Sequence, residues 1–267
     1  MFLALTLQGT RRRGCSIATE TGEVRAYYQR ILPFFEAELA DRGDGGFWNW
    51  AAGTPEGCRV LELGAGTGRA TAFLARSAAR VVAFDLSPEL AAVAKRRFAG
   101  DPKISVFVAD MRRLELNVRF DLIVAVDDPF VHLTGDEDRQ RALETVATHL
   151  APGGRFILDA AWMTPQRRRA AGSPSGLVTE HSKGRLEVRE TSRCDPGTRQ
   201  CFTRYEYRMD GDLAATAAFR GRLWSIAELR HLARAAGLQV ARLWGDYDRR
   251  PWERETSPRL IAEIVAT

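Results

Sequence analysis

Lysine is scarce in this sequence, although the chain carries a formal net charge of +5. Only three of the 39 basic residues are lysine, and the arginines are scattered apart from two short triplets at 11–13 and 167–169. A nucleic-acid binding domain usually gathers its basic residues on one face or in one stripe. The arginine excess is as consistent with GC-rich coding as with phosphate binding, so we do not expect nucleic acid as a partner.

Cysteine is also rare, with Cys15, Cys58, Cys194 and Cys201 as the complete set. No Cys-x-x-Cys spacing and no adjacent histidine cluster is present, which argues against a metal site and a disulfide framework. Cys194 and Cys201 could face each other across a hairpin. We nevertheless expect free thiols, and no metal.

Long apolar runs are absent too, because no stretch reaches the roughly 18 to 20 residues that span a bilayer. The first 15 residues place apolar residues before arginines, the reverse of a secretory signal. We expect a disordered leader at 1–20 and a cytoplasmic protein. The 267 residues suffice for one α/β domain with an insertion or for two small domains.

What the sequence does contain is a regular alternation of apolar runs and helical patterns. Strands are expected at 59–64, 80–85, 104–110, 120–127 and 155–161, with helices after the first, second and fourth. Near-continuous apolar strands are typical of a parallel sheet that helices cover on both faces. Ahead of them, 24–39 has helical periodicity that Pro33 interrupts, and 41–57 reads as a connector.

The pattern changes after residue 162. Segments 177–181, 185–194, 199–209 and 216–224 alternate polar and apolar residues around Gly- and Pro-containing turns. This predicts an antiparallel meander of about four strands with one solvated face. A helix at 225–237 and strands at 238–244 and 259–266 follow.

The segment "VLELGAGTGRA" at 60–70 carries the clearest chemical signal. Gly64, Gly66 and Gly68 lie between a strand and a helix, where glycines let a ligand lie against a tight backbone turn. The dinucleotide fingerprint would require a glycine where Arg69 stands. Together with the acidic Glu62 ahead of the turn, this spacing favours a nucleoside over a dinucleotide.

Two acidic residues end the next two strands. Asp85 follows Gly64 by 21 residues, where a carboxylate can accept hydrogen bonds from both ribose hydroxyls. Asp110 could accept from an adenine amino group, with Met111 packed on the ring. The alternatives are a helix N-terminal acid for Asp85 and a loop cap for Asp110.

In this order, "ELGAGTG", Asp85, "FVADM", "FDLIVAVDD" and "HLAPGGRFILD" resemble the class I S-adenosylmethionine-dependent methyltransferases. The resemblance is close over 55–162 and looser over 225–267. It implies S-adenosyl-L-methionine as cofactor and S-adenosyl-L-homocysteine as product. The cofactor residues that it implies are Glu62, Gly64, Ala65, Gly66, Asp85, Leu86, Asp110, Met111, Val126 and Asp127.

The same resemblance implies the fold and the domain organisation. We expect an α/β, Rossmann-like, doubly wound seven-stranded sheet with the last strand antiparallel. The methyltransferase domain would comprise 21–162 and 223–267, and 163–222 would be an antiparallel β lid inserted after the fifth strand. Glycine and amino-sugar N-methyltransferases carry such a lid, and their N-terminal helix often supplies a tyrosine; Tyr27 and Tyr28 are the candidates, with Tyr28 preferred.

The end of the fourth strand, "AVDDPFVHL", should adjoin the methyl acceptor, because ligands bind beyond the carboxyl ends of such strands. Asp128 could bind a cationic amine and His132 could be a general base. Alternatively Asp128 belongs to a helix-start cluster and His132 is a structural hydrogen-bonder. His181 in the lid is a weaker candidate for the base.

We therefore predict a methyltransferase that acts on a small-molecule amine or hydroxyl, as a monomer or homodimer without a membrane partner. Asp127-Asp128-Pro129-Phe130 also nearly matches the Asp-Pro-Pro-aromatic motif of nucleic-acid amino-methyltransferases, which leaves base methylation as one alternative. A non-catalytic S-adenosylmethionine-binding module is the other. The fold alone cannot choose between them.

Overall fold

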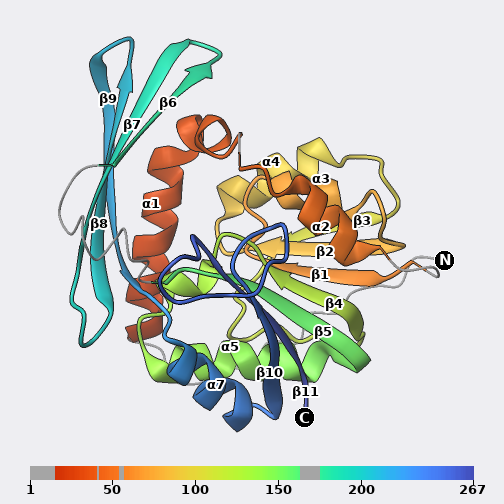
Figure 1. The fold of residues 1–267 in the computed structure, drawn as a ribbon. Coiled ribbons are helices and arrows are strands. Elements are labelled where there is room, and N and C mark those ends of the chain that lie inside the picture. Colours follow the sequence, from red (N-terminus) through yellow and green to blue (C-terminus); the bar gives the residue numbers. More distant parts are fainter. Residues whose placement is uncertain (1–15, 41, 54–56, 163–174) are drawn as a thin grey trace.

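The computed structural model describes residues 16–40, 42–53, 57–162 and 175–267, with two β-sheets (Figure 1). The larger sheet has seven strands in the order β10-β11-β5-β4-β1-β2-β3. Their bounds are β1 Arg59–Leu63, β2 Arg80–Asp85, β3 Ile104–Val108, β4 Phe120–Ala125, β5 Leu150–Ala160, β10 Leu238–Trp244 and β11 Leu260–Ala266.

The strand directions confirm the predicted Rossmann-like sheet. β1 pairs in parallel with β2 and β4, and the parallel pairing extends to β3 and β5. Only the last strand, β11, runs antiparallel to its neighbours β5 and β10. The strand order reverses between β1 and β4, and this switch point is where open α/β sheets bind ligands.

Helices cover both faces of this sheet. α5 (Asp136–His149) and α7 (Ile226–Ala235) contribute Leu143, Val146 and Leu229 to the apolar core on one face. α2 (Gly45–Ala52) and α3 (Arg69–Leu74) contribute Trp48 and Leu74 to the core on the other. α4 (Pro88–Arg97) packs on β2 and β3. The sequence analysis missed α2, which lies within the expected connector.

A second, four-stranded antiparallel sheet confirms the predicted insertion, within residues 175–222. Its order is β6-β7-β8-β9, and we call it the lid sheet. The strands are β6 Ser175–His181, β7 Gly184–Cys194, β8 Gln200–Met209 and β9 Asp212–Arg222. The segment 163–174, which was assigned to the same insertion, lies outside the described residues.

Helix α1 (Ser16–Glu38) lies between the lid sheet and the body of the molecule (Figure 1). Its Ile31 and Phe34 pack with Leu186, Val188 and Tyr207 of the lid sheet in a third buried cluster. The helix continues through Pro33, where an interruption was expected, and the Pro33 carbonyl accepts a hydrogen bond from His181 Nε2 at 2.9 Å. It also begins at Ser16, inside the segment expected to be a leader, whereas 1–15 lie outside the described residues.

The expectation that Cys194 and Cys201 are free thiols was wrong, because they form a disulfide. The antiparallel register of β7 and β8 places the two residues directly opposite each other. Their seven-residue separation closes one hairpin, so the bond staples the β7–β8 turn of the lid sheet. Cys58 remains a free, buried thiol.

Among the described residues, no helix is both long and apolar enough to cross a membrane.

Candidate functional site

The glycine turn follows β1 and lies at the switch point of the sheet. Gly64 and Gly66 have positive φ angles of 69° and 57°, a conformation that L side chains rarely adopt. A Cβ on Gly64 would stand 2.6 Å from Pro129 Cβ, so the glycine lets the β1 turn approach the segment after β4. A Cβ on Gly66 would stand 3.0 Å from the Phe35 ring of α1. The turn is therefore enclosed from two sides.

Asp85, at the end of β2, holds this turn in place. Its two carboxylate oxygens accept hydrogen bonds from the backbone N–H groups of Gly66 and Ser87, each at 2.8 Å. The side chain is 7% exposed, and burial raises its pKa. The neighbouring Leu86 carbonyl accepts from Arg25 Nε of α1 at 3.0 Å. Asp85 thus connects the end of β2 to the turn after β1, next to the contact that Arg25 of α1 makes with Leu86.

Glu62 lies below the turn, within β1, and is 1% exposed. Thr71 of α3 donates a hydrogen bond to its carboxylate at 2.5 Å, and burial raises the pKa of Glu62 to about 7. The interaction ties β1 to the first turn of α3.

Asp110, beyond β3, forms a tight pair with Arg112. The guanidinium lies 2.6 to 3.1 Å from the Asp110 oxygens and also contacts Asp138 and Thr21. Burial raises the pKa of Asp110, but the Arg112 hydrogen bonds outweigh it and lower the pKa overall. The adjacent Met111 is half-buried against the core. Through Thr21, the third strand end is joined to α1 as well.

The two acidic residues in the segment after β4 bind different partners. Asp127 and Asp128 have positive φ angles of 55° and 46°, and their side chains have different partners. Asp127 pairs with Arg42 and Arg69, each at 3.2 Å. Val126, just before it, is buried in the core on the α2 and α3 face.

Asp128 is 1% exposed and is bound to the end of β5 and to the segment after the lid sheet. Its oxygens accept from the Ala161 N–H at 2.6 Å and from Trp224 Nε1 at 3.4 Å. Burial raises its pKa to about 7, although the Arg139 charge and these hydrogen bonds act in the opposite direction. Both carboxylate oxygens are thus engaged by the protein itself.

His132 lies on the short 3-10 helix η1 (Pro129–His132) and meets Tyr28 of α1. The Tyr28 hydroxyl lies 2.9 Å from His132 Nε2. Burial lowers the pKa of His132 to about 4 and raises that of Tyr28, so both groups are neutral at neutral pH. The His132 Nδ1 atom is inaccessible to solvent and has no hydrogen-bond partner among the described residues.

A cluster of charged side chains, where the lid sheet joins α5 and α7, holds the segment that carries His132. Arg139 of α5, 0% exposed, donates to the Leu133 carbonyl at 2.8 Å and stacks 4.0 Å over the Trp224 ring. Glu228 of α7 binds the guanidinium groups of Arg139, Arg199 and Arg222 at 3.1, 2.8 and 2.6 Å. Because both arginines 199 and 222 belong to the lid region, this carboxylate connects the lid sheet to the segment that carries His132.

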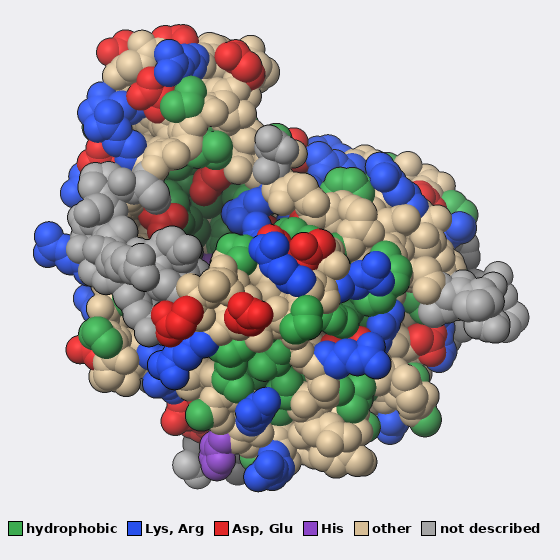
Figure 2. Space-filling model, viewed as in Figure 1, with side chains coloured by type: hydrophobic (Ala, Val, Ile, Leu, Met, Phe, Trp, Pro, Cys, Tyr) green, Lys and Arg blue, Asp and Glu red, His purple; other side chains and the backbone are tan. Residues whose placement is uncertain are grey.

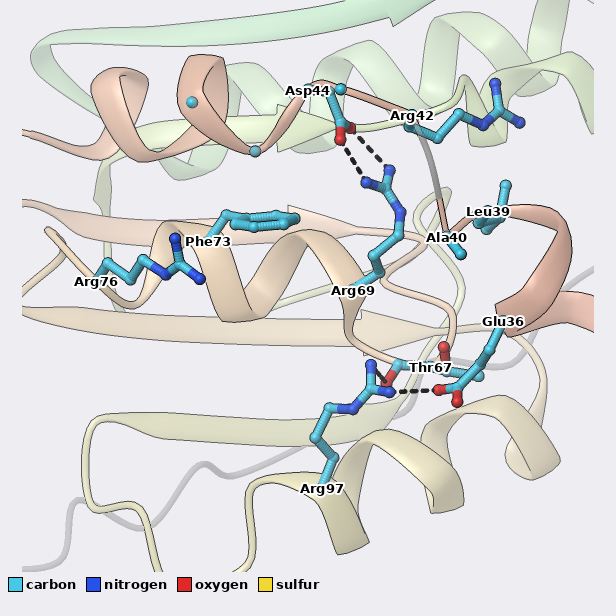
Figure 3. Close-up of a pocket in the computed structure, with 13 residues that line it drawn as sticks. Glu36, Leu39, Ala40, Arg42, Asp44, Thr67, Arg69, Phe73, Arg76 and Arg97 are labelled. Atoms are coloured by element: carbon cyan, nitrogen blue, oxygen red, sulfur yellow. Dashed lines mark hydrogen bonds and ion pairs between the residues drawn. The ribbon is translucent and has the colours of Figure 1, made fainter. Parts of the chain in front are cut away.

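A cavity of about 600 Å³ adjoins the glycine turn (Figure 3). The cavity is lined by Thr67 and Arg69, from the turn and the start of α3, and by Glu36 and Arg42, from α1 and the segment after it. Arg69 binds Asp44 through two hydrogen bonds of 2.5 and 2.8 Å. Neither Arg42 nor Asp44 was predicted from the sequence. Their charged partners, Asp127 for Arg42 and Arg69 for Asp44, are far away in the chain, so no local motif marks these ion pairs.

The structure brings most of the predicted residues to one edge of the sheet. Direct contacts connect the glycine turn to Asp85 and to Pro129, and Tyr28 to His132. Asp110 reaches the same edge through Arg112 and Thr21. Asp128 is at this edge too, but its carboxylate is bound to the Ala161 N–H and to Trp224. His181 is apart from the others, on the Pro33 carbonyl.

Comparison with known proteins agrees with this architecture. A family model described as "Methyltransferase domain" matches residues 60–154. The chain is 31% identical over 208 residues to a cypemycin N-terminal methyltransferase of a Streptomyces species, covering 77% of this chain and 82% of that protein. It is 28% identical over 146 residues, 55% of this chain and 56% of the relative, to a dTDP-3-amino-3,6-dideoxy-alpha-D-glucopyranose N,N-dimethyltransferase of Streptomyces fradiae.

Solved structures are similar in fold. The CcbJ methyltransferase of Streptomyces caelestis matches with a TM-score of 0.71 and 22% identity, over 87% of this chain and 96% of that one. CalS10, an amino pentose methyltransferase of Micromonospora echinaspora solved with its S-adenosylmethionine, matches with a TM-score of 0.65 and 21% identity, over 97% and 100%.

Proposed function

This chain belongs to the S-adenosylmethionine-dependent methyltransferases, and we propose that it methylates an amine nitrogen of a small molecule or of a peptide terminus. Two relatives support an amine: one is named for a peptide N-terminus and the other for an amino sugar. The observation that carries the proposal is the Tyr28–His132 pair, a neutral hydrogen-bonded couple with one unengaged ring nitrogen beside the switch point.

The residues at the strand ends fit the cofactor. Backbone N–H donors orient the Asp85 carboxylate, and each of its oxygens retains a lone pair for a ribose hydroxyl. The positive φ angles of Gly64 and Gly66 leave the turn without side chains where a ligand would lie against it. Arg42 and Arg69 line the cavity, and although both pair with Asp127, their guanidinium groups have further N–H donors that suit the amino-acid carboxylate of the cofactor. We propose that Glu62 positions the glycine turn and that Asp127 positions Arg42 and Arg69.

When bound, S-adenosylmethionine would supply the methyl group of its sulfonium sulfur to the acceptor nitrogen in line, and the electron pair of the broken C–S bond would stay on sulfur. The chain's own contribution is orientation, exclusion of water and removal of a proton. An acceptor amine arrives protonated and must lose that proton to expose its lone pair. His132 is neutral at neutral pH, and in the tautomer in which its Nε2–H donates to the Tyr28 oxygen, the unengaged Nδ1 carries the lone pair that can take the proton.

Asp128 has a different part in this proposal. Its engaged oxygens and its burial favour a positioning role, in which the residue fixes the end of β4 against β5 and Trp224. This would hold the His132 segment at a constant distance from the glycine turn.

A matched pair of acceptors tests the proposal. We expect S-adenosylhomocysteine release with a short serine-containing peptide that has a free α-amine, or with an amino sugar. The same peptide after N-acetylation, and the corresponding neutral sugar, should give none. Mass spectrometry would locate the added 14 Da on nitrogen. Methylation of the acetylated peptide or neutral sugar would instead identify a hydroxyl acceptor, and absence of S-adenosylhomocysteine binding by calorimetry would refute the proposal altogether.

A further inference from the structure

The inner face of the lid sheet, which is the face toward α1, has a part that is buried against α1 and a part that is not. Leu186 and Val188 of β7 are buried against α1, but further along the same face of the strand stand Glu190 and Ser192. The neighbouring strands continue this second part with Tyr205 of β8, opposite Glu190, and with Phe219 of β9. Figure 2 shows the molecule hollowed between the lid sheet and the body, with acidic and hydrophobic side chains in the hollow and basic side chains at its border.

Two carboxylates, one on this part of the lid sheet and one on α1, lack an ion-pair partner among the described residues. Glu190 accepts from Ser192 at 3.0 Å and from the Tyr205 hydroxyl at 3.3 Å. Glu38, at the end of α1, accepts from the Tyr207 hydroxyl at 2.9 Å. Within the described ranges, neither forms a salt bridge, although the chain has five more basic than acidic residues. Burial raises the pKa of Glu38, and although the Tyr207 hydrogen bond and the Arg42 charge act against it, the charge of Glu190 acts in the same direction as burial.

The rings beside these carboxylates connect them to His132. Phe219 lies 4.9 Å from the His132 ring and 5.1 Å from Tyr27, and Tyr205 is stacked 6.3 Å from Phe219. A separate observation points to a ligand at this place: the buried Nδ1 of His132 has no partner among the described residues. Aromatic faces next to a carboxylate are the usual environment of an organic cation.

We propose that Glu190, with Glu38 and the rings of Tyr205 and Phe219, binds the acceptor in its cationic, ammonium form before proton removal. This rests on the proposed amine acceptor and assigns the residues that would select it. The carboxylates provide the counter-charge and the rings provide cation–π contacts, while His132 is placed at the inner end of the group. A neutral acceptor of the same shape would leave Glu190 without a counter-ion among the described residues.

Two probes of equal shape and different charge test this without knowledge of the natural acceptor. Choline is a cation, and 3,3-dimethylbutan-1-ol is its neutral isostere. Each is titrated by ligand-observed NMR into the full chain saturated with S-adenosylhomocysteine. We expect choline to bind at least tenfold more tightly than the alcohol, and Glu190→Gln to reduce this preference to less than twofold.

The matched control is Glu187→Gln, on the same strand but on the opposite face and paired with Arg185. It should retain the full preference, and thermal unfolding would verify that both variants fold. Equal binding of the two probes to the wild type, or a preference that survives Glu190→Gln, would overturn the inference. Because S-adenosylhomocysteine binding is measured first, its absence would instead identify a failure of the proposed function.

Discussion

The two sides of the candidate site, the proposed cofactor side and the proposed acceptor side, are built in different ways. On the cofactor side, short chain segments and backbone groups do most of the positioning: Asp85 is held by two N–H donors within 20 residues of it in the chain. On the acceptor side, side chains from distant segments meet, as Tyr28 meets His132 across 104 residues and Tyr207 meets Glu38 across 169. The first side depends on one strand–turn–helix unit, and the second on how the lid sheet and α1 dock.

This difference has a functional consequence. A rigid backbone frame suits a ligand that all members of a family share, whereas side chains on an inserted sheet can be exchanged without loss of the frame. Changes on the cofactor side should therefore affect affinity for S-adenosylhomocysteine, and changes on the acceptor side should affect turnover or acceptor preference.

The largest effect is expected for Asp85→Ala. Loss of a charged acceptor for two ribose hydroxyls should weaken S-adenosylhomocysteine binding by about 1000-fold, or about 4 kcal/mol, by calorimetry. Asp101→Ala, an exposed carboxylate in the loop before β3, is the control and should bind normally. If Asp85→Ala folds and binds within a few-fold of wild type, Asp85 serves only the glycine turn.

A smaller effect is expected for the His132→Gln variant, on the acceptor side. Without a base, turnover of an amine acceptor should fall about 100-fold, while S-adenosylhomocysteine affinity changes less than threefold. Tyr28→Phe should give an intermediate loss, because the ring nitrogen would then lose its hydrogen-bond partner. His231→Gln on the exposed face of α7 is the control. Full turnover in His132→Gln would show that positioning alone is sufficient for the reaction.

The sequence predicted the fold around the glycine turn well because its signals are local. The seven-stranded sheet, its antiparallel last strand and the lid sheet were all identified from periodicity, turn residues and the resemblance to a family. The glycine turn and Asp85 belong to one continuous strand–helix–strand unit. Their spacing along the chain translates directly into their positions at the sheet edge.

The sequence predicted less of the acceptor side, because the contacts on that side are long-range. Nothing near Glu190 in the sequence indicates that Tyr205 will lie opposite it, or that Glu38 will end α1 beneath the lid sheet. The Cys194–Cys201 disulfide was missed for a related reason, because it depends on the register of one hairpin. Helix α2 was hidden by the Gly45-Gly46 pair at its start, although the apolar "FWNWAA" run that follows provides its buried face.

The smallest effect concerns Asp128, which lies between the two sides. Its pKa is raised to about 7 by burial, so its carboxyl group is protonated in the folded chain at pH 5 and ionised at pH 8. The unfolded chain, with an ordinary pKa near 4, is already ionised at both. The folded state thus binds the extra proton, and the contribution of Asp128 to stability is lost as the pH rises toward 7.

Asp128→Asn cannot titrate, so the unfolding free energy of wild type minus that of Asp128→Asn should fall by about 2 kcal/mol between pH 5 and pH 8. Urea unfolding at both pH values measures this difference, and shifts from Glu62 and Asp159 cancel because both chains contain them. A difference independent of pH would mean that Asp128 is ionised throughout. A permanent charge at the end of β4 would then favour direct contact with a cationic acceptor and place Asp128 on the acceptor side, beside His132.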